Sequence, residues 1–171
     1  MKNYLSSEEI KTIKEISNEY DKAYKLVSIL FAETYDKAGE PYLNHLLRVS
    51  QKLKNPATQV AGLLHDILED IKGFTLNDLE VLGFSQTIID IVFIVTRPDD
   101  SNLTYDEYIT KILSSSNLEA IKLKYSDMTD NLEPNRLAKL TLAEQERLQK
   151  KYTPELIRIK NYLQERNCLY E

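Results

Sequence analysis

The sequence predicts an all-α protein, a compact bundle of about eight helices. Three observations predict this fold class. The 171 residues include only 4 Gly and 5 Pro, about half the usual share of turn formers, which argues against a sandwich or barrel of many short strands. Apolar residues recur at helical spacing along most of the chain. Residues typical of helix N-termini precede several of these segments. Because a domain typically has about 100–200 residues, we expect residues 1–171 to form a single domain.

The N-terminal third contains three segments with a helical pattern. Residues Ser6–Glu9 predict a capping box, in which a Ser side chain accepts from a backbone N–H and Glu9 reaches back to the N-cap. A second apolar-faced segment runs from about Tyr20 to Thr34. The pattern then breaks at residues 36–41, a loop with one glycine and one proline, and resumes in a helix expected over residues 41–53.

The middle of the chain predicts three helices in succession. Residues 57–71 carry Val, Leu and Ile at helical spacing and predict one continuous helix. Thr75 and Ser85 are expected to be the N-caps of two more. The run at residues 87–96 is rich in β-branched residues and would suit a buried strand equally well. We interpret it as the helix that follows Ser85, because no second strand is evident to pair with it.

The C-terminal part predicts three further helices. Two are expected over Thr104–Leu113 and Leu118–Leu132. The last is expected to start at Thr153, with Thr153 as N-cap, Pro154 at the first helical position and Glu155 in the first turn.

Composition and charge exclude several classes of function. The 22 Lys+Arg against 27 Asp+Glu give a net charge of −5, which argues against nucleic acid as a partner, because such binding depends on a basic face. No stretch reaches the ~18 apolar residues that a membrane span requires, so we expect no membrane association. Cys168 is the single cysteine, which excludes an internal disulfide framework and indicates a reducing, cytoplasmic location. The pattern leaves the oligomeric state open.

Both histidines lie among Leu and Ile, and the segment around His65 is the more informative. A lone histidine on an apolar helix face is usually a core residue, and for His45 alone this interpretation has the greater weight. Next to His65, however, the acids Asp66, Glu69 and Asp70 fall among residues expected to be buried. Three carboxylates so close repel one another, and a divalent cation would relieve both the repulsion and the cost of burial. The alternative is a hydrated acidic face.

A third segment contains further candidate ligands. Within residues 124–131, Asp127 and Asn131 are one helical turn apart, with Asp130 beside them. One His, a His-Asp pair and an Asp from three helices would supply two nitrogens and two oxygens. Such a set suits Mn²⁺, Fe²⁺ or Zn²⁺ and leaves positions for water and substrate. The four candidate ligands are His45, His65, Asp66 and Asp127.

The order His…His-Asp…Asp on a helical scaffold resembles the HD-domain metal-dependent phosphohydrolases. Three segments are similar to the hydrolase domain of RelA/SpoT-type alarmone enzymes and the free-standing small alarmone hydrolases. They are GEPYLNH at residues 39–45, LLHDILED at residues 63–70 and KYSDMTDN at residues 124–131. The resemblance runs from about residue 35 to residue 140, and it implies an HD-domain helical bundle.

The resemblance also implies roles for individual residues. The four candidate ligands would hold Mn²⁺ or another divalent transition metal. Glu69 and Asp70 would orient or protonate groups in the hydrolytic step, and Asn131 would contact the nucleotide. Lys37 and Arg136 are candidates for contacts with substrate phosphates, although exposed cations are common on any protein surface.

The activity implied by the resemblance is removal of the 3′-pyrophosphate of (p)ppGpp, giving GDP or GTP and pyrophosphate. Two departures from the family pattern bear on the substrate. Asp36 stands where the family usually has Arg, and Met128 and Asp130 stand where it commonly has Arg and His. Another HD-type nucleotidase or nucleotide pyrophosphohydrolase, or a non-catalytic regulator that binds metal and nucleotide, are the alternatives. The acid pair Glu69 and Asp70 favours an enzyme, since binding alone does not need it.

Overall fold

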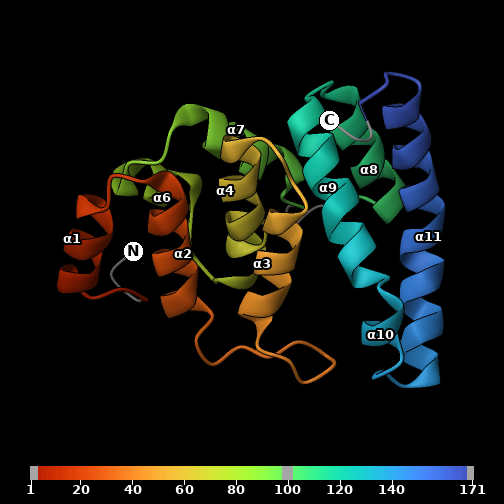
Figure 1. Ribbon diagram of the computed structural model, residues 1–171, viewed down its shortest axis with the longest axis horizontal. Coiled ribbons are helices and arrows are strands. Elements are labelled where there is room, and N and C mark those ends of the chain that lie inside the picture. Colours follow the sequence, from red (N-terminus) through yellow and green to blue (C-terminus); the bar gives the residue numbers. More distant parts are fainter. Residues whose placement is uncertain (1–3, 98–101, 169–171) are drawn as a thin grey trace.

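The computed structural model describes residues 4–97 and 102–168 and confirms the all-α fold class (Figure 1). Within these residues the one β-type pairing is an isolated bridge between Tyr35 and Pro41. None of the helices they form is both long and apolar enough to cross a bilayer. The helices are α1 (Ser7–Glu15), α2 (Glu19–Leu30), α3 (Tyr42–Gln51), α4 (Pro56–Leu64), α5 (Ile67–Asp70), α6 (Leu76–Leu82), α7 (Gln86–Val95), α8 (Tyr105–Ser114), α9 (Leu118–Asn131), α10 (Pro134–Leu137) and α11 (Leu142–Gln164).

Helix α9 lies between two groups of helices. It packs against α3, α4 and α7 on one side and against α8 and α11 on the other (Figure 1). Its residues Ala120 and Leu123 belong to the larger hydrophobic core, which α1 to α7 build, whereas Ile121 and Met128 belong to a smaller core with α8 and α11. Because α9 packs against both cores, its side chains can contact side chains of α3, α4 and α11.

The capping and periodicity signals define most helix ends correctly. The capping box at Ser6 and Glu9 is present, and Ser85 is the N-cap of α7. The ambiguous run at residues 87–96 is helical, as predicted. It is apolar on several sides because α7 packs against α4, α6 and α9 at once.

The prediction of one continuous helix over residues 57–71 is wrong. Helix α4 ends at Leu64 and the single-turn α5 starts at Ile67, which leaves His65 and Asp66 at the junction. The Nδ1 of His65 contacts the carbonyl oxygen of Gly62 at 2.8 Å. In an uninterrupted helix that carbonyl accepts from the N–H of residue 66. The imidazole therefore offers this carbonyl a second donor at the point where the helix is interrupted.

The predicted start of the last helix is also wrong. Helix α11 begins at Leu142, where Thr141 and Glu144 form a capping box, and Pro154 lies in its interior. A proline inside a helix leaves the carbonyl four residues earlier without its N–H donor. Because Pro154 is exposed, water can reach this part of the helix, and the helix continues past the proline.

Gly62 allows α3 and α4 to approach closely. A Cβ atom at this position would lie 2.9 Å from Cα of Ser50 in α3, and the hydroxyl of Ser50 donates to the carbonyl oxygen of Gln59 in α4 at 2.7 Å. Because His45 lies on α3 and His65 ends α4, this close approach also helps to place the two imidazoles.

We expect Gly62→Ala to lower the free energy of unfolding by about 1–3 kcal/mol, because the new methyl group meets backbone that must shift. Helix propensity alone predicts the opposite sign, a gain of about 1 kcal/mol. Urea unfolding of the two proteins decides between these signs. A stabilised variant would contradict the close packing of α3 on α4.

Candidate metal and nucleotide site

The structure brings together the four side chains that the sequence singled out as metal ligands. His45 comes from α3, His65 and Asp66 from the junction of α4 and α5, and Asp127 from α9. The Nε2 atom of His45 lies 3.4 Å from Oδ1 of Asp127 and 3.7 Å from Oδ2 of Asp66. The Nε2 atom of His65 lies 3.1 Å from Oδ2 of Asp66 and 3.7 Å from Oδ1 of Asp127.

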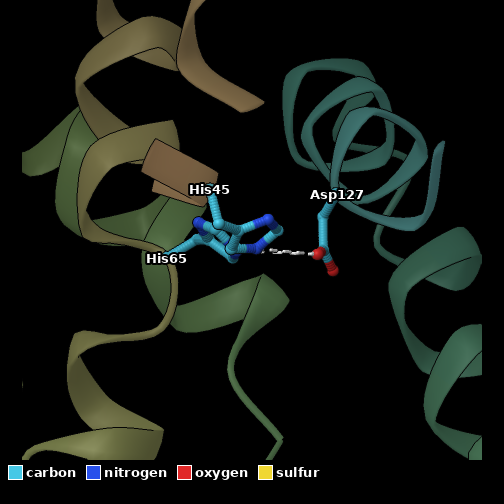
Figure 2. Close-up of side chains that lie close together, drawn as sticks. All are labelled: His45, His65 and Asp127. Carbon is cyan, nitrogen blue, oxygen red and sulfur yellow. Dashed lines mark ion pairs between the residues drawn. The ribbon is translucent and has the colours of Figure 1, made fainter. Parts of the chain in front are cut away.

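The candidate ligand atoms face one another across a small space. In Figure 2 the imidazoles of His45 and His65 lie together, and a carboxylate oxygen of Asp127 points toward them. One ligand atom from each of these three residues lies within 4.8 Å of the other two. His45, His65 and Asp127 are almost fully buried, whereas the side chain of Asp66 keeps 18% of its surface exposed. Solvent therefore meets the cluster at Asp66.

Hydrogen bonds on the far side of each ring fix which nitrogen faces the cluster. The carbonyl of Gly62 can only accept, so Nδ1 of His65 donates to it and Nε2 of the neutral ring carries the lone pair. That Nε2 is buried and has no hydrogen-bond partner of its own. In His45, Nδ1 lies 2.8 Å from Oδ2 of Asp130, and its Nε2 likewise faces the cluster.

These observations fit a divalent transition metal. A buried polar atom without a partner costs free energy, and a cation between the two Nε2 atoms and the two carboxylates would satisfy it. Two imidazole nitrogens and two carboxylate oxygens form a mixed donor set of the kind that Mn²⁺, Fe²⁺ and Zn²⁺ accept. A hydrogen bond on the second nitrogen of each imidazole is typical of metal-binding histidines.

The charged groups of the cluster shift one another's pKa values. Burial alone would raise the pKa of Asp66, but His65 outweighs burial and holds this pKa at about 2. The pKa of Asp127 is also well below its usual range, because Lys124 and the two imidazoles outweigh its burial. In return, the carboxylates raise the pKa of His65 above its usual value despite burial. Protons and a metal ion therefore compete for the imidazoles.

Asp130 orients His45, a role that the sequence analysis did not assign. Asp130 is fully buried and accepts from Nε of Arg48 at 2.9 Å, from Lys52 at 3.3 Å and from Arg136 at 3.3 Å, besides its contact with His45. Its burial raises its pKa, but His45 and the surrounding cations outweigh burial and lower it. Helical spacing contained a signal: Asp130 is three residues after Asp127, and Arg48 is three residues after His45.

Asn131 and Arg136 lie beside the cluster and bind protein groups there. The side-chain amide of Asn131 donates to Oδ1 of Asp127 at 2.6 Å, and Arg136 donates to Oδ1 of Asn131 at 3.2 Å. Arg136 also donates to Oδ2 of Asp36 at 3.1 Å, which ties the loop after α2 to α10. The proposed contacts of Asn131 and Arg136 with a nucleotide therefore stay predictions.

A basic pocket of about 340 Å³ adjoins these residues. Its cations include Lys37 and Arg136, as the sequence suggested, and also Arg147 and Lys151 from α11. The sequence analysis missed the last two because it started the final helix at Thr153. The wall also includes Asn131 and the rings of Tyr35, Tyr42 and Tyr152.

Tyr42 connects the basic pocket to the metal cluster. It lines the pocket, and its hydroxyl donates to Oδ2 of Asp66 at 2.6 Å. A ligand in the pocket would thus lie beside the exposed side of the cluster, with cations opposite. Such an arrangement can bind a phosphorylated molecule and expose it to a metal ion.

Glu69 and Asp70, the predicted catalytic acids, both belong to α5. Glu69 is half-buried, and its Oε1 accepts from the backbone N–H of Arg97 at 2.7 Å. Burial raises the pKa of Glu69, which favours its protonated form. Asp70 ends α5 and is exposed. Their catalytic roles stay predictions.

Lys124 forms a buried ion pair with Asp127, 2.8 Å apart, and its ammonium lies over the ring of Tyr108. We expect Lys124→Met to lower the free energy of unfolding of the metal-free protein by about 3 kcal/mol, because a buried carboxylate loses its cation. Urea unfolding in EDTA measures this loss.

The matched control is Lys122→Met, which removes a more exposed pair with Glu119 and should cost less than about 1 kcal/mol. Equal losses in the two variants would contradict a special role for the Lys124–Asp127 pair.

This chain is similar to known proteins in fold and, over part of its length, in sequence. No model of a known protein family matches the chain. A curated relative, a GTP pyrophosphokinase of Streptomyces coelicolor, is 34% identical over 95 residues. The matched segment is 53% of this chain and 10% of that relative, so the chain corresponds to a small part of it.

A solved structure matches over nearly the whole chain. It is described as a metazoan ortholog of SpoT that hydrolyzes ppGpp and plays a role in starvation responses. The match has a TM-score of 0.62 and 21% sequence identity, and it covers 90% of this chain and 98% of the other. The chain therefore shares the fold of that protein, which confirms at the level of fold the resemblance seen in the three sequence segments.

Proposed function

We propose that this chain is an HD-type metal-dependent phosphohydrolase whose substrate is a phosphorylated nucleotide. The specific reaction proposed is removal of the 3′-pyrophosphate of (p)ppGpp, which gives GDP or GTP and pyrophosphate. The observation that carries the proposal is the convergence of His45, His65, Asp66 and Asp127 beside a basic pocket. The fold shared with a protein described as hydrolyzing ppGpp supports the choice of substrate.

The four converging residues would hold the metal, for which Mn²⁺ is our first candidate among divalent transition metals. When bound, such an ion lowers the pKa of water and withdraws charge from a phosphoryl oxygen. Asp130 orients His45, and the carbonyl of Gly62 orients His65. Both hydrogen bonds would keep the lone pairs of the two imidazoles available to a bound ion.

The other residues of the site would bind and protonate the substrate. Lys37 and Arg136 would neutralise phosphate charge, together with Arg147 and Lys151 from α11. Hydrolysis adds the oxygen of water to the departing pyrophosphate and returns a proton to the ribose 3′ oxygen. Glu69 is our candidate for that proton donor, because burial keeps its carboxyl group protonated to a higher pH. Asp70, one residue further, would orient groups at the solvent side.

The remaining parts of the proposal follow from the substrate class. We propose one HD-type domain over residues 1–171 with a small nucleotide as partner, no nucleic acid and no membrane, acting in the cytoplasm. An oligomer is compatible with it. The synthetic activity in the name of the Streptomyces relative is not carried over, because the match covers only 10% of that protein.

A substrate panel tests the proposal. We expect the purified protein to release pyrophosphate from ppGpp in the presence of Mn²⁺, and EDTA to stop the release. The panel adds 5′-monophosphates and dinucleotides. Turnover of these with ppGpp untouched would indicate another HD-type nucleotidase. Mn²⁺ binding without turnover of any nucleotide would indicate a regulator instead of an enzyme.

A further inference from the structure

A second pocket, of about 410 Å³, lies on another side of α9. The C-terminal end of α3, the loop before α4, α9 and α11 enclose it, and we call it the α3–α9–α11 pocket. Three of its lining residues are lysines, Lys52, Lys54 and Lys122, which we call the lysine rim. Its wall includes the apolar side chains of Leu53 and Leu163 and the ring of Tyr125.

The charge of this rim is predominantly positive. Among the described residues that line the pocket there are three lysines and one acidic side chain, that of Glu119. Glu119 accepts from Lys122 at 3.3 Å and from the hydroxyl of Thr58, so the charges of Glu119 and Lys122 are paired with each other. Lys52 shares the single carboxylate of Asp130 with Arg48 and Arg136, which leaves an excess of positive charge beside the pocket. Pockets of this size with an apolar wall and a few convergent polar groups are typical of small-molecule sites.

We propose that the α3–α9–α11 pocket binds a small organic anion with an aromatic or apolar body, and that this ligand strengthens metal binding at His45. The acidic group of the ligand would bind the lysine rim, and its body would contact Tyr125 and Leu53. The residues that the structure describes include none that lines both this pocket and the basic nucleotide pocket.

A chain of two contacts connects this pocket to the metal cluster. Lys52 donates to Oδ1 of Asp130 at 3.3 Å, and Oδ2 of Asp130 lies 2.8 Å from Nδ1 of His45. An anion that attracts Lys52 weakens the hydrogen bond from Lys52 to Asp130. The Asp130 carboxylate then accepts a stronger hydrogen bond from Nδ1 of His45, which raises the basicity of Nε2 and makes His45 a better metal ligand. The added negative charge acts in the same direction, because it favours a cation nearby. This coupling rests on the proposed metal site, whereas anion binding itself does not.

The first experiment titrates the metal-free full chain with 8-anilino-1-naphthalenesulfonate, an aromatic anion whose fluorescence rises on binding. We expect saturable binding that Lys122→Gln and Lys54→Gln each weaken by about threefold to fivefold, as for loss of one partly exposed ion pair. Lys14→Gln, on the distant α1, and Arg147→Gln, in the nucleotide pocket, should bind like the wild type. Thermal unfolding checks that each variant is folded.

Three results would overturn the binding proposal. They are absence of saturable binding, equal binding by the rim variants and Lys14→Gln, and loss of binding in Arg147→Gln, which would place the probe in the nucleotide pocket.

The second experiment titrates Mn²⁺ with and without the saturating probe. We expect Mn²⁺ to bind about fivefold more tightly in its presence, and Lys52→Gln to reduce this difference. Equal Mn²⁺ affinities would overturn the coupling. Absence of Mn²⁺ binding altogether would instead overturn the proposed function, while the probe titration of the metal-free protein still decides whether the pocket binds anions.

Discussion

Asp66→Asn is expected to weaken Mn²⁺ binding by at least about a hundredfold. Loss of a residue that only orients a metal ligand costs up to about a hundredfold in metal affinity, and loss of a ligand should cost at least as much. Oδ2 of Asp66 lies 3.1 Å from Nε2 of His65 and 3.7 Å from Nε2 of His45. The substitution keeps the shape of the side chain and removes the charge that a divalent cation needs. Calorimetric titration with Mn²⁺ measures the loss, and pyrophosphate release from ppGpp should fall with it.

The fold should tolerate Asp66→Asn, because the hydroxyl of Tyr42 can donate to the new amide oxygen as it does to the carboxylate. The matched control is Asp90→Asn on the exposed face of α7, which should bind Mn²⁺ like the wild type. An Asp66→Asn protein that is folded and keeps its Mn²⁺ affinity would show that Asp66 is not a ligand.

Glu69→Gln is expected to lower the rate of hydrolysis by roughly 10²–10⁴-fold, the usual contribution of a general acid, with Mn²⁺ affinity unchanged. A glutamine oxygen can still accept from the backbone N–H of Arg97, so the side chain should keep its place. It has no carboxyl proton to give to the ribose oxygen. Initial rates of pyrophosphate release, measured at saturating Mn²⁺, give the effect.

Glu80→Gln, on the exposed surface of α6, is the control for Glu69→Gln and should leave the rate as it is. A Glu69→Gln rate close to that of the wild type would remove Glu69 from the proposed mechanism. Loss of Mn²⁺ binding in the same variant would assign it to the metal site.

Local signals predicted much of the fold because capping and periodicity act over a few residues. The capping box at Ser6 and the helix after Ser85 are both where the sequence places them. The break between α4 and α5 was not predictable in this way. The break coincides with one side-chain bond, from His65 to the carbonyl of Gly62, which lies within an otherwise regular apolar pattern.

The sequence alone predicted which residue types could bind a metal at the candidate site. The prediction that these residues lie together depended on the resemblance to a known family. Spacing along the chain cannot show that His45 and Asp127 meet, since they lie on different helices. Two other features depend on tertiary structure. The contact of Asp130 with His45 forms when α3 lies against α9, although the spacing of Asp130 from Asp127 already pointed to this side of the helix. Arg147 and Lys151 join the pocket because α11 extends back to Leu142.

The most direct measurement is a crystal structure of the protein grown with Mn²⁺, with anomalous scattering recorded to locate the ion. The account predicts one strong anomalous peak within coordination distance of Nε2 of His45 and His65 and of carboxylate oxygens of Asp66 and Asp127. A cluster without a peak at saturating Mn²⁺, or a peak bound by other residues, would contradict it.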